Sequence, residues 1–228
     1  MKSKLIACFG DSITQGQPGV SYLKYLDKKI YQNHGLGGDT LTGMLNRVKE
    51  NISKSECNNY ILQIGTNDVL LPHLKECSNA WKNKIKVKNK APIVDLSRYR
   101  DEYEKLIEVL HTKHISIISI PCLGENLNSD LNKKVDAYNL VIMNICNNKG
   151  IRYINFNSWQ KKSIREKENH YFISENPNDV IWDSLLTTYL GLSGWISKKR
   201  DLDITVDGVH LNCKGAIGLA KLIMKEKE

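Results

Sequence analysis

Short strand-like runs alternate with helical stretches along this chain, and this alternation constrains its fold more than any other feature. The strand-like runs, rich in β-branched and aromatic residues, are 5–9, 29–33, 60–65, 115–120 and 151–156. The stretches with helical periodicity or length are about 20–28, 40–54, 98–113, 130–148 and 213–226. Alternating strands and helices predict an α/β fold in which a five-stranded parallel sheet is covered by helices on both faces.

Two longer segments, 70–96 and 157–204, interrupt the alternation and are interpreted as insertions. A chain of 228 residues with 41% hydrophobic content has the size of one α/β domain. Because the sequence contains no internal repeat, low-complexity tract or Gly/Ser linker, we predict a single domain over 1–228 with both insertions folded onto it.

The amino-terminal "MKSKLIACFG" resembles a signal peptide only superficially, because its apolar run is short and no cleavage site follows. We therefore expect a cytoplasmic protein, and no apolar run is long enough for integral membrane association. The six cysteines lack the spacing of a zinc site and the density of a disulfide scaffold, so we expect reduced thiols. We also expect no metal and no cofactor.

The net charge of +8 raises the question of nucleic acid or an anionic substrate. The densest lysine block, "WKNKIKVKNK" at 81–90, has no nucleic-acid-binding signature and favours a solvated surface. We expect no nucleic-acid partner; a nucleic-acid binder would instead bind with steep salt dependence.

The stretch "KLIACFGDSITQGQ" at 4–17 ends a buried strand abruptly at Ser12. In a doubly wound sheet, ligands bind outside the carboxyl ends of the strands, where Ser12 is expected to lie. We expect Gly10 to adopt a backbone conformation closed to other residues. Taken alone, however, Gly-Asp-Ser is an ordinary turn, and it favours Asp11 or Ser12 as a helix cap over a catalytic role.

Two further blocks follow the next strands: "NHGLGGDT" at 33–40 and "GTND" at 65–68. The glycines do not form the G-x-G-x-x-G pattern of a dinucleotide site, because Thr40 occupies its last position. A glycine N–H and the Asn67 side-chain amide are instead candidate donors to an oxyanion.

Near the carboxyl terminus, "DGVHLNCKG" places Asp207 three residues before His210. This spacing lets the carboxylate meet the imidazole, and a base oriented in this way activates a serine hydroxyl. A lone histidine before a helix more often serves packing or capping. Asp207 and His210 by themselves are therefore weak evidence for a catalytic pair.

The four blocks together resemble those of the SGNH or GDSL hydrolases. The resemblance implies that Ser12 is the nucleophile, His210 the base and Asp207 its orienting partner. It also implies an oxyanion hole formed by Ser12, Gly38 and Asn67.

The same resemblance implies a flavodoxin-like three-layer α/β/α fold with strand order 2-1-3-4-5, and metal-free hydrolysis of esters or thioesters through an acyl-enzyme. Asp11 and Asp68 are then expected to hold the loops in place. The departures are small: Ile13 stands where the family name has Leu, and Leu211 follows the histidine where Pro is frequent.

The expected activity is a serine esterase that acts on a small-molecule ester, with an acetyl or short acyl group on a sugar or lipid-derived alcohol. Alternatives are an acyltransferase using the same site, a thioesterase or lysophospholipase, and a non-catalytic binding module. The oligomeric state is left open.

All four tryptophans lie in the insertions: Trp81 in the first, and Trp159, Trp182 and Trp195 in the second. Because both insertions leave the sheet edge that presents Ser12, we expect the four rings to line the substrate pocket. The alternative is a small satellite core that holds the second insertion together.

Overall fold

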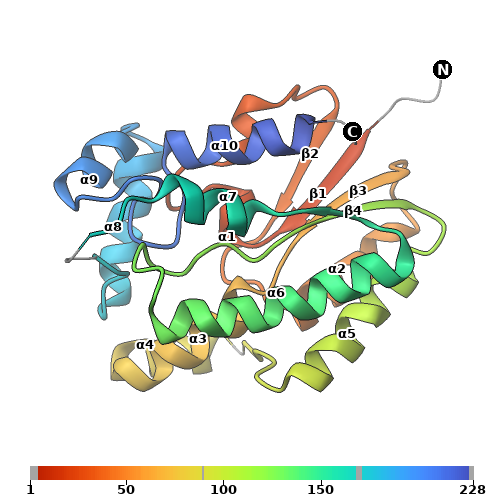
Figure 1. Ribbon diagram of the computed structural model, residues 1–228, viewed down its shortest axis with the longest axis horizontal. Helices are drawn as coiled ribbons and strands as arrows, with labels where there is room; N and C mark the ends of the chain where they lie inside the picture. Colours follow the sequence, from red (N-terminus) through yellow and green to blue (C-terminus); the bar gives the residue numbers. More distant parts are fainter. Residues whose placement is uncertain (1–4, 89, 168–170, 226–228) are drawn as a thin grey trace.

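Five parallel strands form one sheet with helices on both faces (Figure 1). The computed structural model describes residues 5–88, 90–167 and 171–225. The strands are β1 (Ile6–Gly10), β2 (Tyr31–Gly35), β3 (Asn59–Gln63), β4 (His114–Ile118) and β5 (Arg152–Ile154). Their order, β2-β1-β3-β4-β5, confirms the predicted fold class.

The helices occupy the connections between the strands and the carboxyl-terminal part of the chain. They are α1 (Ser12–Gln15), α2 (Leu41–Ile52), α3 (Thr66–Cys77), α4 (Asn79–Val87), α5 (Leu96–Val109), α6 (Asp130–Lys149), α7 (Phe156–Ser163), α8 (Pro177–Thr188), α9 (Ser193–Lys199) and α10 (Cys213–Met224). The helix expected over 20–28 is only a short 3-10 helix, η1 (Tyr22–Tyr25), because Leu26 already has an extended backbone. Residue 226, where the last helix was predicted to end, lies outside the described residues.

Alternate side chains of the strands supply two hydrophobic cores, one on each face of the sheet. In β1, Ala7 and Phe9 join the core beneath α2, α3, α5 and α6, whereas Cys8 joins the core beneath η1, α7 and α10. Figure 1 shows these two helical layers on opposite sides of the strands. Burial on both faces explains why the central strands β1 and β3 contain apolar runs in the sequence, whereas the edge strand β2 is polar and only partly buried.

The strand register brings the sequence blocks to one level of the sheet. Gly10, at the end of β1, pairs with Gly35 of β2 on one side and with Gln63 of β3 on the other. The segments that follow these three residues therefore leave the sheet at the same edge, as the blocks at 10–12, 33–40 and 65–68 require.

The two predicted insertions contain helices, α3 and α4 in the first and α7, α8 and α9 in the second, joined by irregular segments, and they contact each other. The Ser78 hydroxyl donates to the Glu175 carbonyl at 2.7 Å, and the Trp81 indole donates to the Ser174 carbonyl at 2.9 Å. Residues 89 and 168–170 of these insertions lie outside the described residues. These contacts support the single-domain assignment, which stays a prediction.

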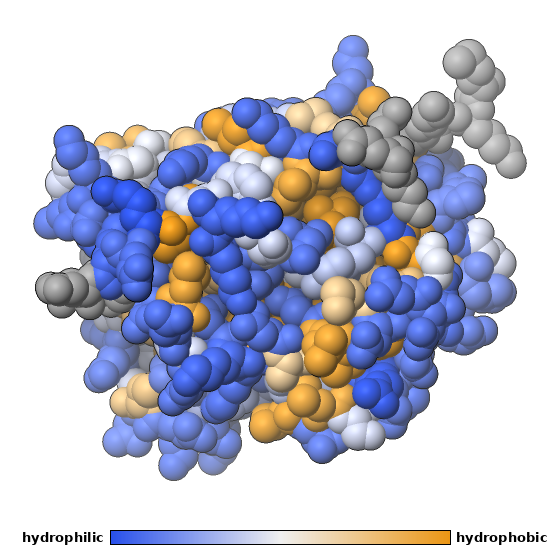
Figure 2. Space-filling model, viewed as in Figure 1, coloured by the Kyte–Doolittle hydropathy of each residue, from blue (hydrophilic) through white to orange (hydrophobic). Residues whose placement is uncertain are grey.

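On the face seen in Figure 2, hydrophobic side chains form separate areas among hydrophilic ones. Within the part of the chain that the structure describes, none of the helices has the length and apolar content needed to cross a membrane.

Candidate active site

Ser12 is the first residue of α1, directly beyond the end of β1. Asp11 caps this short helix by accepting a hydrogen bond from the Ile13 N–H at 2.9 Å. Gly10 is required for space rather than for an unusual φ, contrary to our expectation: its φ is not in the left-handed region, but a Cβ there would overlap the Thr14 side chain. The glycine thus lets the chain turn tightly against β3 and present Ser12.

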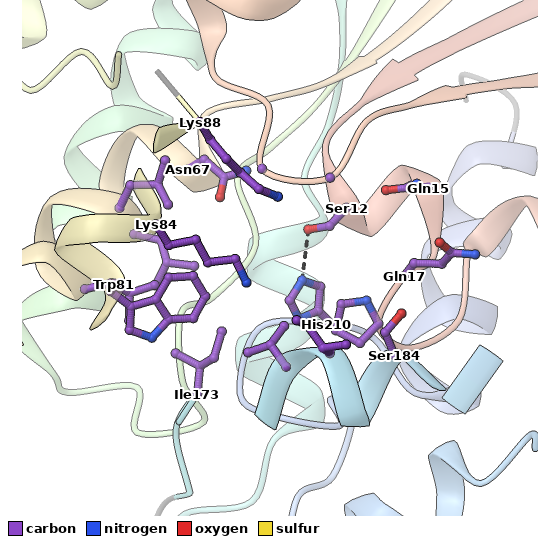
Figure 3. A pocket seen from close by; sticks show the side chains of 18 of the residues that line it. Ser12, Gln15, Gln17, Asn67, Trp81, Lys84, Lys88, Ile173, Ser184 and His210 are labelled. Atoms are coloured by element: carbon purple, nitrogen blue, oxygen red, sulfur yellow. Dashed lines mark hydrogen bonds between the residues drawn. The ribbon is translucent and has the colours of Figure 1, made fainter. Parts of the chain in front are cut away.

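Ser12, His210 and Asp207 form a continuous hydrogen-bonded chain, of which Figure 3 shows the link between Ser12 and His210. The Ser12 Oγ lies 2.9 Å from His210 Nε2, and His210 Nδ1 lies 2.7 Å from Asp207 Oδ2. All three side chains are buried. The other carboxylate oxygen of Asp207 accepts the backbone N–H groups of Val209 and His210, at 3.0 and 2.8 Å. The imidazole is therefore held between a fixed carboxylate and the serine hydroxyl.

The electrostatics of this pair favour a charged histidine. Burial lowers the pKa of His210, but the charge and hydrogen bond of Asp207 outweigh burial, and the net pKa lies above the ordinary 6.5. Burial raises the pKa of Asp207, but the charge of His210 and the hydrogen bonds from it and Val209 hold the net pKa below the ordinary 3.8. Asp207 thus remains ionised beside an imidazole of raised basicity.

Gly38 and Asn67 lie on the same cavity as Ser12. Gly38 has a φ of 71°, in the left-handed region that glycine adopts without strain. The Asn67 Nδ2 donates one hydrogen bond to the Asp39 carbonyl at 2.9 Å. An amide has two N–H donors, so the other is available to a ligand in the cavity.

A partly buried ion pair between Arg47 and Asp39, which sequence reasoning missed, holds the loop that carries Gly38. The Arg47 guanidinium contacts Asp39 Oδ2 through Nε at 2.9 Å and Nη2 at 2.6 Å. It also donates to the carbonyls of His34 and Gly10, at 2.8 and 3.2 Å. Arg47 thereby ties this loop to the ends of β1 and β2, a role that no local pattern in the sequence indicates.

Asp11 and Asp68 both make contacts that hold the loops in place. Asp68 accepts the backbone N–H groups of Leu41 and Ile93, at 3.0 and 2.9 Å. Besides capping α1, Asp11 accepts a hydrogen bond from Gln63 Nε2 at 3.2 Å. Burial raises the pKa of both, that of Asp68 to about 7.

Glu125 holds the segment that leads to Asp207, a role the sequence analysis also missed. This buried carboxylate accepts the N–H groups of Asp203, Ile204 and Thr205, at 2.7, 3.0 and 3.1 Å, and the Thr205 hydroxyl at 2.7 Å. A single buried glutamate so far from the sequence blocks carries no pattern that would have revealed this contact.

A cavity of about 370 Å³ opens beside the Ser12–His210 pair (Figure 3). Its apolar wall comes from both insertions, the first of which includes most of α3. The wall residues are Leu70, Leu71, Leu74, Trp81, Ile85, Ile173, Val180, Ile181, Leu185 and Tyr189. The volume is that of a small-molecule site.

Of the four tryptophans expected in the pocket, the structure places only Trp81 there. Trp159 instead stacks on Phe156 and packs against Gly218 of α10, where a Cβ would overlap its ring. Trp182 and Trp195 are exposed and do not line the cavity. The expectation was wrong for these three because Trp159 packs between α7 and α10, and the two exposed rings do not contribute to the cavity wall.

A profile of the GDSL-like Lipase/Acylhydrolase family matches residues 8–216. The chain therefore belongs to this family and is an enzyme of the ester-hydrolysing class. A search of curated proteins found no match.

Solved structures of this class share the fold. An acetylxylan esterase from Geobacillus stearothermophilus, solved as a catalytic mutant, superposes with a TM-score of 0.64 at 16% identity, covering 98% of this chain and 95% of that one. The lipase/acylhydrolase from Enterococcus faecalis gives 0.62 at 16% identity, covering 96% and 93%. A lipolytic G-D-S-L protein from Veillonella parvula gives 0.59 at 18% identity, covering 96% and 95%.

Proposed function

We propose that this protein is a serine esterase that cleaves carboxylic esters through an acyl-enzyme on Ser12. The observation that carries the proposal is the hydrogen-bonded chain from Ser12 Oγ through His210 to Asp207. It provides a nucleophile, a base and a fixed carboxylate in contact, beside a cavity of substrate size.

In the first half of the reaction, the Ser12 oxygen attacks the ester carbonyl and its proton passes to His210 Nε2. The carbonyl oxygen becomes an oxyanion, for which the Ser12 and Gly38 N–H groups and the Asn67 amide are the proposed donors. When this tetrahedral intermediate collapses, the bond to the alcohol breaks and His210 donates the proton to the departing oxygen. An ester between the acyl group and Ser12 remains.

In the second half, a water molecule attacks the acyl-enzyme and its proton passes to His210. Collapse of the second tetrahedral intermediate releases the carboxylic acid and returns the proton to Ser12. Asp207 stays ionised throughout and stabilises the imidazolium that forms in each half.

The cavity suggests how the two parts of the ester are arranged. The apolar wall around Trp81 suits an acyl chain longer than acetyl. Gln17 and Ser184 lie on the other side of the Ser12–His210 pair (Figure 3) and suit a polar alcohol such as a sugar or glycerol. The acetylxylan esterase among the structural neighbours is consistent with the sugar alternative.

The test is a panel of esters that varies acyl length and alcohol, with wild type and Ser12→Ala compared throughout. Wild type should hydrolyse the panel and be labelled by a fluorophosphonate probe, whereas Ser12→Ala should do neither and keep its melting temperature. Ser184→Ala, which changes a serine on another wall of the same cavity, should still be labelled. Labelling or near-normal turnover of Ser12→Ala would contradict the proposal.

A further inference from the structure

Three lysines, Lys84, Lys88 and Lys90, line the cavity that contains Ser12 and His210. Among the described residues that form the cavity wall, none is acidic. The cavity therefore joins an apolar wall to a cluster of positive charge.

These lysines lie close to the proposed oxyanion donors. Figure 3 shows the side chains of Lys84 and Lys88 extending from the α4 side toward the space between Asn67, Ser12 and His210. Lys90 approaches Gly38, because its Cε lies 3.9 Å from the position that a Cβ on this glycine would occupy. An ester bound at Ser12 would thus lie within reach of several ammonium groups.

The described part of the chain provides no carboxylate partner for these three ammonium groups. Lys84 lies 5.0 Å above the centre of the Trp81 ring and donates to the Pro177 carbonyl at 3.4 Å, both neutral groups. Burial, and next the charge of Lys88, lower its pKa. The negative charge of an anion bound between the two side chains would offset both effects.

Solvation of the helix surface accounts for only some of the lysines in this block. Lys82 and Lys86 are exposed and do not line the cavity, as the sequence analysis expected. Lys84 and Lys90 are partly buried, and Lys88 is exposed but reaches the cavity. The helix dipole stabilises every lysine near the carboxyl end of α4, whether or not it lines the cavity. It therefore does not explain why Lys84, Lys88 and Lys90 lie at one site.

We propose that Lys84, Lys88 and Lys90 form an anion subsite that selects esters with a carboxylate or phosphate group near the bond to be cleaved. This inference rests on the proposed esterase function. A small anionic ester fits the cavity volume of about 370 Å³, which a nucleic-acid polymer does not. Charge-assisted hydrogen bonds from ammonium groups in a partly buried site would supply the selectivity.

Two matched substrate pairs locate the anionic group. Mono-p-nitrophenyl adipate against p-nitrophenyl hexanoate places the charge on the acyl side, and a 1-acylglycerol 3-phosphate against the same 1-acylglycerol places it on the alcohol side. The measured quantity is the ratio of kcat/KM for the anionic ester to kcat/KM for the neutral one.

The variants are the double substitution Lys84→Gln/Lys88→Gln and the matched control Lys82→Gln/Lys86→Gln, which removes the same charge from positions of α4 that do not line the cavity. For at least one pair, we expect the wild-type ratio to exceed one and to fall about 10-fold or more in the cavity double variant. In the control it should change by less than about 2-fold. Lys88→Gln alone, at an exposed position, should lower the ratio in the same direction and guards against misfolding of the double variant.

A ratio that is unchanged in the cavity variants, or that falls equally in the control, would overturn the subsite. Hydrolysis of the neutral esters with no preference for the anionic ones would overturn the subsite and leave the esterase function standing. Absence of turnover with every ester, neutral or charged, would overturn both.

Discussion

At the scale of single residues, the site depends on contacts between side chains that are far apart in sequence. Ser12 and His210 are 198 positions apart, yet their side chains lie at 2.9 Å. Two of the proposed oxyanion donors are held in place by neighbouring groups. The Asn67 amide bonds to the Asp39 carbonyl, and Arg47 pairs with Asp39 in the loop that carries Gly38. Single substitutions at these positions should therefore show which side chains act in the reaction and which ones stabilise the fold.

The pH dependence of catalysis should report on His210. His210 must be neutral to accept the Ser12 proton, so kcat/KM should rise with pH through an apparent pKa above the ordinary 6.5 and level off at higher pH. Asp207→Asn removes the charge that raises this pKa while burial, which lowers it, remains. The acid limb should therefore shift to lower pH, and the rate should fall by at most about 10⁴-fold.

Steady-state profiles of the two proteins on one neutral ester measure this shift. An acid limb that stays in place in Asp207→Asn would contradict the assignment of the limb to the His210–Asp207 pair.

Asn67→Ala should lower kcat by about 10²- to 10³-fold with little change in KM, because the amide is proposed to contact charge that develops only in the transition state. Asn67→Asp serves as a second variant, since it keeps the size but replaces the donor by an acceptor, and kcat should also fall. An effect confined to KM would assign Asn67 to substrate binding instead.

At the scale of elements, the segment that carries Asp207 and His210 has no regular secondary structure of its own apart from a single bridge between Thr205 and Leu211. Its position relies on Glu125, which accepts three consecutive backbone N–H groups. Arg200 adds a second tie by donating to the Val206 carbonyl at 2.8 Å and pairing with Asp183 of α8.

Glu125→Ala should lower the free energy of unfolding on the order of 3 kcal/mol, because three backbone N–H groups, two of them buried and that of Asp203 partly buried, lose their acceptor at about 1 kcal/mol each. The kcat should fall at temperatures where the variant is still folded, since Asp207 and His210 lose their support. Chemical denaturation and steady-state kinetics measure the two effects. The control is Glu104→Ala, which removes an exposed glutamate of α5 and should change the free energy of unfolding by less than about 0.5 kcal/mol. Equal stability of the two variants would show that Glu125 does not stabilise the segment that leads to Asp207.

At the scale of the whole molecule, the two insertions meet over the active-site edge of the sheet and build the apolar wall together. Trp81 of α4 bonds to Ser174, and Gly19 of the loop after α1 donates to Thr187 of α8 at 2.9 Å. The second insertion also contains buried residues such as Ile164 and Ile196. Deleting it would remove part of the folded structure, so single substitutions in the wall are the better test.

Trp81→Ala should shift substrate preference away from longer acyl chains. The ratio of kcat/KM for a hexanoate ester to that for an acetate ester should fall roughly 10-fold, because the apolar contact with the chain is lost while the reacting groups remain. Trp195→Ala, which removes an exposed indole outside the cavity, should leave the ratio unchanged. A shift of the same size in both variants would exclude a specific role for Trp81.

The sequence alone was sufficient to predict the sheet and the residues that meet at its edge. Strand runs such as 5–9 and 60–65 are apolar because both faces of the sheet are covered, and this local pattern is visible without the structure. The parallel order then requires the segments after β1, β2 and β3 to converge, and the resemblance of four short blocks supplied the roles proposed for Ser12, Asn67 and His210.

Tertiary structure decided what local patterns do not encode. Trp81 and Trp159 both follow strands in insertions, yet one lines the cavity and the other packs under α10, since this depends on how α4 and α7 dock. Lys84 and Lys86 are two residues apart on α4, yet Lys84 lines the cavity and Lys86 is exposed to solvent. The partners of Glu125 are likewise about 80 residues away in the sequence. Strand periodicity and short motifs depend on near neighbours, whereas the wall, the charge and the supports of the site depend on contacts that exist only once the helices have packed.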